Sequence, residues 1–305
     1  LASAQRKKLF YTNKSVKITE LCIAYRVLLH YNTNIDDCQH KIRLYKGVFI
    51  MKIGAQLYTL HNFTKTREGF SEALKKVADI GYTSVQVSGT CAYEPEWLAE
   101  QLKANGLTCD LTHYDFGKVL ADPEKVVADH KIFGCKYIGL GSMPGIWAPD
   151  ANADTFKDFI AKAVPAAKRI AAAGGYFMYH NHAIEFKTFD GKLGMDYLTE
   201  AFAPNEMGFT LDTHWVKAGG YDPVEWFKRL AGRIPCVHYK DLVVKDGKNL
   251  FAPVGSGTLD FDAIIKTSID LGVEYAFVEQ DDCYGEDPYA CLKKSYDYLK
   301  SMGLN

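Results

Sequence analysis

The chain has 305 residues, of which 48% are hydrophobic and 24% are charged, as in an ordinary soluble globular protein. Its formal net charge of −1 argues against nucleic acid or an anionic membrane surface as a partner. No apolar run approaches the roughly 20 residues of a membrane-spanning helix. The eight cysteines form no Cys-x-x-Cys pair, which disfavours a zinc ribbon or redox motif and favours reduced thiols. We therefore expect a cytoplasmic globular protein.

Residues 1–50 differ in composition from the rest of the chain. They hold nine Lys and Arg against three acids, a charge of +6, which leaves −7 for residues 51–305. The segment has a single glycine and no proline. We interpret it as an N-terminal extension outside the main fold. It could be a translated region upstream of a start at Met51, a lineage-specific extension, or a targeting or nucleic-acid arm; we favour the first.

From Met51 onward, short apolar runs alternate with longer amphipathic segments, which predicts alternating strands and helices. The predicted strands are 52–59, 84–88, 107–113, 137–141, 176–182, 207–212, 235–240 and 275–279. The predicted helices are 66–80, 94–105, 123–133, 153–173, 195–202, 223–230, 261–271 and 288–302. Eight such units of about 30 residues predict one α/β domain over residues 51–305, a (β/α)₈ TIM barrel. A doubly wound open sheet would need a glycine-rich phosphate turn or fewer strands.

The C-terminal ends of the predicted strands carry most of the chain's candidate functional side chains. In a (β/α)₈ barrel these ends lie on one face, where catalytic groups gather. Glu185, Asp212, His238 and Glu279 follow one another at steps of 27, 26 and 41 residues, each about one repeat. We therefore expect the four to converge on one point, where mixed oxygen and nitrogen ligands would suit Mn²⁺, Mg²⁺, Co²⁺ or Zn²⁺. The alternative is a scatter of surface acids and core histidines.

Several motifs combine these residues with their neighbours: IGAQLYTL, YHNHAIEF, LDTHWVKAGG followed by DPVEW, VHYKD, VGSGTLDF and VEQDD. In combination they resemble the sugar phosphate isomerase/epimerase family, the xylose isomerase-like TIM barrels that include inosose dehydratases and ketose 3-epimerases. The resemblance runs from Met51 to the C-terminus. It implies a divalent metal held by a Glu, an Asp, a His and a Glu. Asp212, His238 and Glu279 match three of these ligands.

The fourth ligand, on the fifth strand, is where the sequence departs from that pattern. Many members place a Glu directly in this strand, whereas here the strand reads His180, Asn181 and His182. The nearest carboxylate is Glu185. We expect Glu185 to be the ligand and keep His180 and His182 as alternatives.

The resemblance implies a metal-dependent isomerase or epimerase of a sugar, sugar phosphate or keto-polyol. Such an enzyme removes the proton next to a carbonyl through a metal-stabilised enediolate. The alternative is a lyase or dehydratase that uses the same site on an inosose or keto-glycoside. A nuclease would need a basic face, which the −7 of the barrel argues against, and a sugar-binding barrel without metal is a further alternative.

These implied functions divide the candidate residues by role. We expect Glu185 and Glu279 to transfer protons, with His182 as the rival base. The residues expected to contact substrate are His113, His180, His214, Lys240 and Trp147. His113 could instead be structural, and Lys240 could instead pair with Asp241. The loop 245–257 is expected to be a mobile cover. The expected partner is a small carbohydrate, and the sequence is also compatible with a homo-oligomer.

Overall fold

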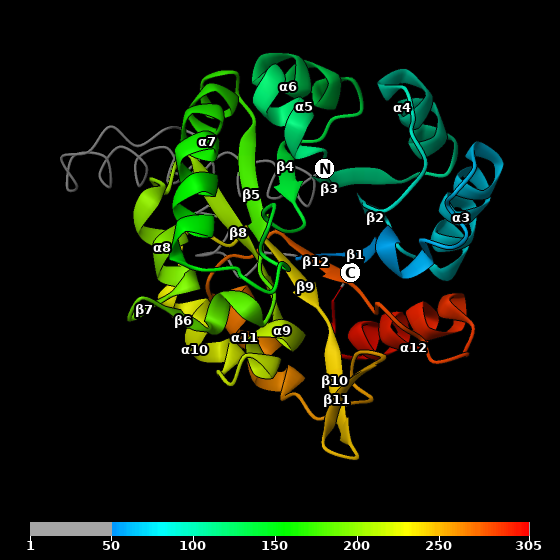
Figure 1. The fold of residues 1–305 in the computed structure, drawn as a ribbon. Coiled ribbons are helices and arrows are strands. Elements are labelled where there is room, and N and C mark those ends of the chain that lie inside the picture. The colour runs from blue at the N-terminus through cyan, green and yellow to red at the C-terminus, as the bar shows by residue number, and fades with distance from the viewer. Residues whose placement is uncertain (1–50, 305) are drawn as a thin grey trace, which may run out of the picture. The chain divides into compact units, whose positions relative to one another are not determined.

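The computed structural model describes residues 51–304, so the interpretation of residues 1–50 lies outside the described residues. Eight strands form a closed barrel in the order β1-β12-β9-β8-β5-β4-β3-β2 (Figure 1), and every neighbouring pair is parallel. The strands are β1 (Lys52–Gln56), β2 (Ser84–Val87), β3 (Thr108–His113), β4 (Tyr137–Leu140), β5 (Tyr176–His180), β8 (Met207–Asp212), β9 (Cys236–Tyr239) and β12 (Tyr275–Val278). The predicted (β/α)₈ barrel is confirmed.

A helix follows each barrel strand and packs outside the barrel (Figure 1). These are α3 (Arg67–Ile80), α4 (Pro95–Ala104), α6 (Pro123–Ile132), α7 (Ala153–Ala172), α8 (Gly194–Ala201), α10 (Pro223–Arg229), α11 (Phe261–Asp270) and α12 (Pro288–Ser301). Side chains cap several N-termini, as Thr66 does by accepting the N–H of Gly69. Each predicted helix is therefore present, and neither end differs from the prediction by more than one residue. Within the described residues, no helix is long and apolar enough to cross a membrane.

Short elements between strand and helix were not predicted. The first predicted strand ends early because Leu57–Leu60 forms a 3-10 helix, η1, whose entry is held by the Gln56 side chain accepting the N–H of Tyr58. The other short helices are α5 (Phe116–Ala121), η2 (Ile184–Phe186) and α9 (Thr213–Ala218). They lie at the C-terminal ends of the strands, so they set where the strand-end side chains point.

Two β-hairpins decorate this same end of the barrel. One of them pairs β10 (Asp241–Lys245) with β11 (Lys248–Ala252) and extends away from the barrel (Figure 1); its turn and β11 lie within the expected cover loop, 245–257. The other pairs β6 (Thr188–Phe189) with β7 (Lys192–Leu193). Both turns are Asp-Gly, at 190–191 and 246–247, with positive φ at both residues. This is the hairpin signal that the reading of 245–257 as a loop overlooked.

Apolar side chains fill the interior of the barrel. Leu111, Tyr137, Met178, Cys236 and Phe277 form one buried cluster contributed by five strands. The packed interior leaves the polar strand-end residues on one face, above an apolar floor.

Candidate active site

Four ionisable side chains from neighbouring strands meet at the C-terminal end of the barrel. They are His180 at the end of β5, Asp212 at the end of β8, His238 in β9 and Glu279 just past β12. One ligand atom of each lies within 4.8 Å of the others, and all four residues are buried. The structure thus brings Asp212, His238 and Glu279 together as expected and adds His180.

Hydrogen bonds on the outer side of the two imidazoles set which nitrogen faces the group. His180 Nδ1 lies 3.1 Å from the carbonyl oxygen of Gly141, which can only accept, so Nδ1 carries the proton. His180 Nε2 then faces Asp212 Oδ2 at 3.1 Å. A lone pair turned toward a carboxylate is repelled unless a second proton or a cation lies between them. The arrangement therefore suits a bound cation.

His238 is oriented in the same way from the opposite side of the barrel. Its Nε2 donates to Gln86 Oε1, 2.5 Å away on β2. Its Nδ1 faces Glu279 Oε2 at 3.0 Å and Asp212 Oδ2 at 3.6 Å. A second hydrogen bond that fixes the outer nitrogen is the usual support for a metal-binding histidine.

The electrostatics of the group keep its carboxylates ionised. Burial raises the pKa of both Asp212 and Glu279, but the Lys240 ammonium and the nearby imidazoles hold each pKa well below its usual range. Burial and the neighbouring His238 lower the pKa of His180, so its ring is neutral. Burial opposes the charge on His238, but Glu279 and Asp212 raise its pKa to about 9. Two carboxylates and two imidazoles without a thiolate suit Mn²⁺, Mg²⁺, Co²⁺ or Zn²⁺.

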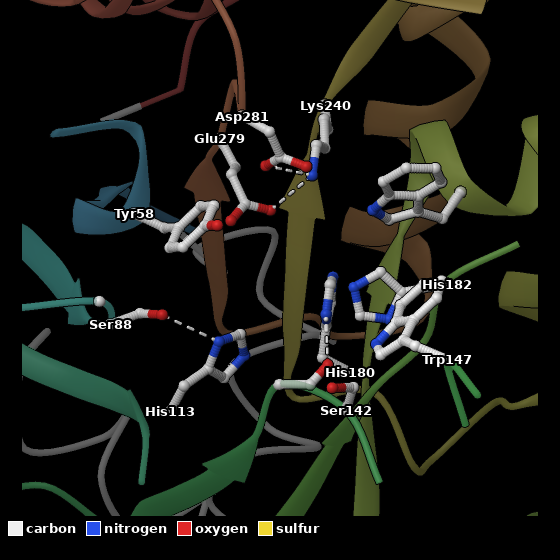
Figure 2. A pocket seen from close by; sticks show the side chains of 13 residues that line it. Tyr58, Ser88, His113, Ser142, Trp147, His180, His182, Lys240, Glu279 and Asp281 are labelled. Atoms are coloured by element: carbon white, nitrogen blue, oxygen red, sulfur yellow. Dashed lines mark hydrogen bonds and ion pairs between the residues drawn. The ribbon is translucent and has the colours of Figure 1, made fainter. Parts of the chain in front are cut away.

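Lys240 lies beside this group and is 1% exposed. Its Nζ is 3.0 Å from Glu279 Oε2 and 2.6 Å from Asp281 Oδ1 (Figure 2). The alternative pairing with Asp241 is not formed. The Asp241 carboxylate instead accepts backbone N–H groups from Leu242, Gly255, Gly257 and Leu259.

A cavity of about 450 Å³ opens above the group, a size that suits a small molecule. Figure 2 shows Tyr58, Ser88 and His113 on one side of it and His182 with Trp147 on the other. The Nδ1 of His113 is 3.1 Å from Ser88 Oγ, while its Nε2 has no hydrogen-bond partner among the described residues. The cavity is therefore lined by polar side chains as well as by aromatic faces.

Most of the predicted site residues line this cavity: His113, Trp147, His180, His182, Lys240 and Glu279. His214 does not. Its Nδ1 donates to the carbonyl oxygen of Asp241 at 3.2 Å, and its ring packs against Phe251. The structure thus separates His214 from the expected substrate-binding residues, because α9 turns its ring toward the β10–β11 hairpin.

Glu185 requires the main correction. It belongs neither to the four-residue group nor to the cavity lining. Its carboxylate accepts the hydroxyl of Tyr179 at 2.7 Å and the backbone N–H of His182 at 2.8 Å. The expected roles of Glu185 as metal ligand and proton-transfer group are therefore not supported. The turn η2 carries its side chain away from the barrel axis, and His180, one of the alternatives, takes the fifth-strand position.

Other residues of the site were given no role in the prediction from the sequence. Gln86 gave a signal, because it is the one amide in the buried strand SVQV. Asp281 lies in the VEQDD motif but was given no role, although it lines the cavity beside Lys240. Ser88 also lines the cavity and was not predicted as a site residue. Trp215, which the sequence suggested as an aromatic wall of the pocket together with Trp147, lines the cavity as well.

The closed barrel and the ionisable group at its strand ends define a class of TIM-barrel proteins with a candidate metal centre. The model of the xylose isomerase-like TIM barrel family matches residues 74–301, so the chain belongs to that family.

Individual relatives agree with this assignment. Inosose dehydratase of Geobacillus kaustophilus (strain HTA426) is 25% identical over 274 residues, which cover 76% of this chain and 86% of that protein. A sugar phosphate isomerase/epimerase from Parabacteroides distasonis ATCC 8503 superposes with a TM-score of 0.69 at 23% identity, covering 82% of this chain and 94% of that one. The probable 3-DHS dehydratase AsbF from Bacillus anthracis gives a TM-score of 0.62 at 18% identity, covering 82% and 99%.

Proposed function

We propose that this protein is a metal-dependent sugar isomerase or epimerase that removes the proton next to a substrate carbonyl. The observation that carries the proposal is the buried group of His180, Asp212, His238 and Glu279 at the base of the cavity. The name of the Parabacteroides relative, a sugar phosphate isomerase/epimerase, supports the same substrate class. A sugar, sugar phosphate or keto-polyol is the proposed substrate.

In this proposal the four residues of the group hold a divalent cation. Such a cation would polarise the carbonyl and stabilise the charge of an enediolate. Glu279 both belongs to the group and lines the cavity, so we assign it as the base that takes the proton.

We assign roles to other residues that line the cavity from their protonation state and their position in the lining. Burial and the nearby His180 hold the pKa of His182 well below its usual range, so its ring is neutral, and we keep it as the rival base in the cavity wall. His113 and Lys240 both line the cavity, where they would bind substrate oxygens. Trp147 and Trp215 offer aromatic faces to the sugar.

A dehydratase or other lyase is the second candidate. The observation that favours it is the Lys240 ammonium, 3.0 Å from the Glu279 carboxylate in the cavity wall. A fixed positive charge next to the base suits elimination, because it can stabilise the negative charge that develops on the departing oxygen as the carbon–hydrogen bond breaks. The relative named inosose dehydratase points the same way.

Product mass in D₂O separates these candidates. Ketoses, their phosphates, inososes and keto-glycosides would be incubated with the Mn²⁺-loaded protein and followed by mass spectrometry. Deuterium uptake without loss of mass supports the isomerase or epimerase. Loss of water or of an aglycone supports the lyase. Absence of both deuterium uptake and elimination across the panel would overturn both.

Asp212→Asn tests the metal centre itself. The amide retains an oxygen that can accept the N–H of Trp215, as Asp212 Oδ1 does at the start of α9, but it removes the negative charge. We expect Mn²⁺ affinity, measured by titration calorimetry, to fall more than about 100-fold. Asp222→Asn is the matched control, because Asp222 caps α10 in the same way outside the cavity. A folded wild-type protein that binds no Mn²⁺, Mg²⁺, Co²⁺ or Zn²⁺ would contradict the proposal.

A further inference from the structure

Glu185 is a fully buried carboxylate that the proposed chemistry leaves without a role. Both of its oxygens are engaged, one by the Tyr179 hydroxyl and one by the backbone N–H of His182. Its own backbone packs closely against the start of α8, where a Cβ on Gly194 would lie 2.8 Å from the Glu185 carbonyl oxygen. Glu185 is thus held in one place, where it binds the Tyr179 hydroxyl and the backbone of His182, a residue that lines the cavity.

Tyr179 links Glu185 to the loop between β4 and α7. Its hydroxyl accepts the backbone N–H of Met143 at 3.3 Å while donating to Glu185. Met143 lies in the segment 141–152 between β4 and α7, which also carries Trp147. Tyr179 and Met143 are themselves almost fully buried. The hydrogen bonds from Glu185 therefore reach the loop of Trp147 through one side chain.

The segment 141–152 and the loop after β5, which carries His182 and Glu185, contribute to the same wall of the cavity. The rings of Trp147 and His182 lie 4.8 Å apart at an interplanar angle of 82°, and both line the cavity (Figure 2). Glu185 binds the backbone of His182 directly and the loop of Trp147 through Tyr179. No other carboxylate among the described residues contacts both loops in this way.

We propose that Glu185 is a positioning residue that holds Trp147 and His182 together as a substrate-facing wall. The inference rests on the proposed function, because it treats this cavity as the substrate site. A buried carboxylate with two fixed donors leaves both donors unpaired when it is removed, so the loops lose their common anchor. A wall that is held less firmly positions substrate less well.

Fluorine NMR of protein labelled with 5-fluorotryptophan tests this without a substrate. Trp147→Phe assigns the Trp147 resonance, and Trp97 on α4 serves as an internal control. In Glu185→Gln and Glu185→Ala we expect the Trp147 resonance to move by more than its linewidth while that of Trp97 stays. Mn²⁺ affinity should change by less than about threefold, since no metal ligand is lost. Glu200→Gln, an exposed glutamate of α8 paired with Lys192, is the matched control.

Tyr179→Phe provides a second variant that keeps Glu185 in place. It removes the hydroxyl between Glu185 and Met143, so the Trp147 resonance should again move while Mn²⁺ affinity is kept. An unchanged Trp147 resonance in folded Glu185→Gln and Tyr179→Phe would overturn the inference. Loss of Mn²⁺ binding in Glu185→Gln would also overturn it, by making Glu185 a ligand. A wild-type protein that binds no metal would instead count against the proposed function.

Discussion

Gln86 shows how one side chain can prepare a metal ligand from across the barrel. It is fully buried in β2 and accepts from Nε2 of His238. This bond leaves Nδ1 of His238 turned toward Asp212 and Glu279. The amide thus selects the tautomer that can bind a cation.

Replacing Gln86 should therefore weaken metal binding without unfolding the protein. We expect Gln86→Leu to lower Mn²⁺ affinity about 10- to 100-fold, because His238 loses its fixed orientation. Titration calorimetry gives the affinity, and circular dichroism checks the fold. Gln101→Leu on α4, which loses only a hydrogen bond to Ser71, should bind Mn²⁺ like the wild type. Equal affinity in Gln86→Leu would contradict the assigned orientation.

Glu185 should make the stability of the protein depend on pH. Burial raises its pKa from about 4.5 to about 7, although the Tyr179 hydroxyl and the N–H of His182 oppose the shift. A raised pKa means that the folded state holds this proton more tightly than the unfolded state. The stabilisation is therefore fully present below the unfolded pKa and is lost as the pH rises through about 7.

Urea unfolding of wild-type protein and Glu185→Gln at several pH values measures this effect. Relative to the variant, the wild type should lose about 2 kcal/mol of unfolding free energy between about pH 5.5 and 8.5. The variant carries a constant offset, since its amide places an N–H₂ against one of the two donors. A difference that does not change with pH would show that Glu185 stays ionised.

Among the strands, β1 and β12 pack closely because β1 has a glycine, Gly54, where β12 has an aromatic ring. Gly54 is paired with Phe277 in the parallel register. A Cβ at Gly54 would lie 2.5 Å from the Phe277 ring and 3.1 Å from the carbonyl oxygen of Ser84. The absence of a side chain on β1 therefore makes room for an aromatic ring in the barrel core.

Gly54→Ala should destabilise the barrel by overpacking this contact. We expect a loss of about 1–3 kcal/mol in the free energy of unfolding, measured with urea. Phe277→Leu should relieve the clash, so the double variant should be more stable than the sum of the single effects by about 0.5 kcal/mol or more. Strict additivity would mean that the strain arises elsewhere.

The segment 245–257, expected to be a loop that covers the cavity, has regular structure and fixed hydrogen bonds. Its first part forms the turn and the second strand of the β10–β11 hairpin, and the segment after the hairpin is hydrogen-bonded to Asp241. The Asp241 carboxylate accepts the N–H groups of Gly255, Gly257 and Leu259. Three hydrogen bonds thus attach the segment 255–259 to Asp241, the residue that follows Lys240 of the cavity wall.

At the scale of the whole molecule, residues 51–304 contain all eight strands of the closed barrel. Each strand finds both of its neighbours inside this range, so no edge is left unpaired. The family model also matches only within it, at residues 74–301.

We therefore predict that a protein beginning at Met51 retains the thermal stability and Mn²⁺ affinity of the full chain. Differential scanning calorimetry and titration calorimetry on both proteins measure this. The reason is that strand pairing, the apolar core and the candidate ligands all lie beyond Phe49. A midpoint lower by more than about 5 °C would mean that residues 1–50 contribute about 1 kcal/mol or more to folding.

The amino-acid sequence was sufficient to predict the barrel architecture and the barrel face on which the site lies. Alternating apolar periods are local, and so is the position of an ionisable residue at the end of an apolar run, as for Asp212 and His238. Because parallel strands in a barrel all point the same way, those positions were enough to bring Asp212, His238 and Glu279 together.

The remaining members of the site depend on how the whole fold packs. Whether His180 or Glu185 joins the group depends on the turn η2, which swings Glu185 onto Tyr179 and leaves His180 facing Asp212. Gln86 meets His238 across 152 residues of chain, a pairing set by barrel closure and by no local pattern. Side-chain direction beyond a strand end and contact across the barrel both depend on packing of the whole fold, which a local reading of the sequence does not contain.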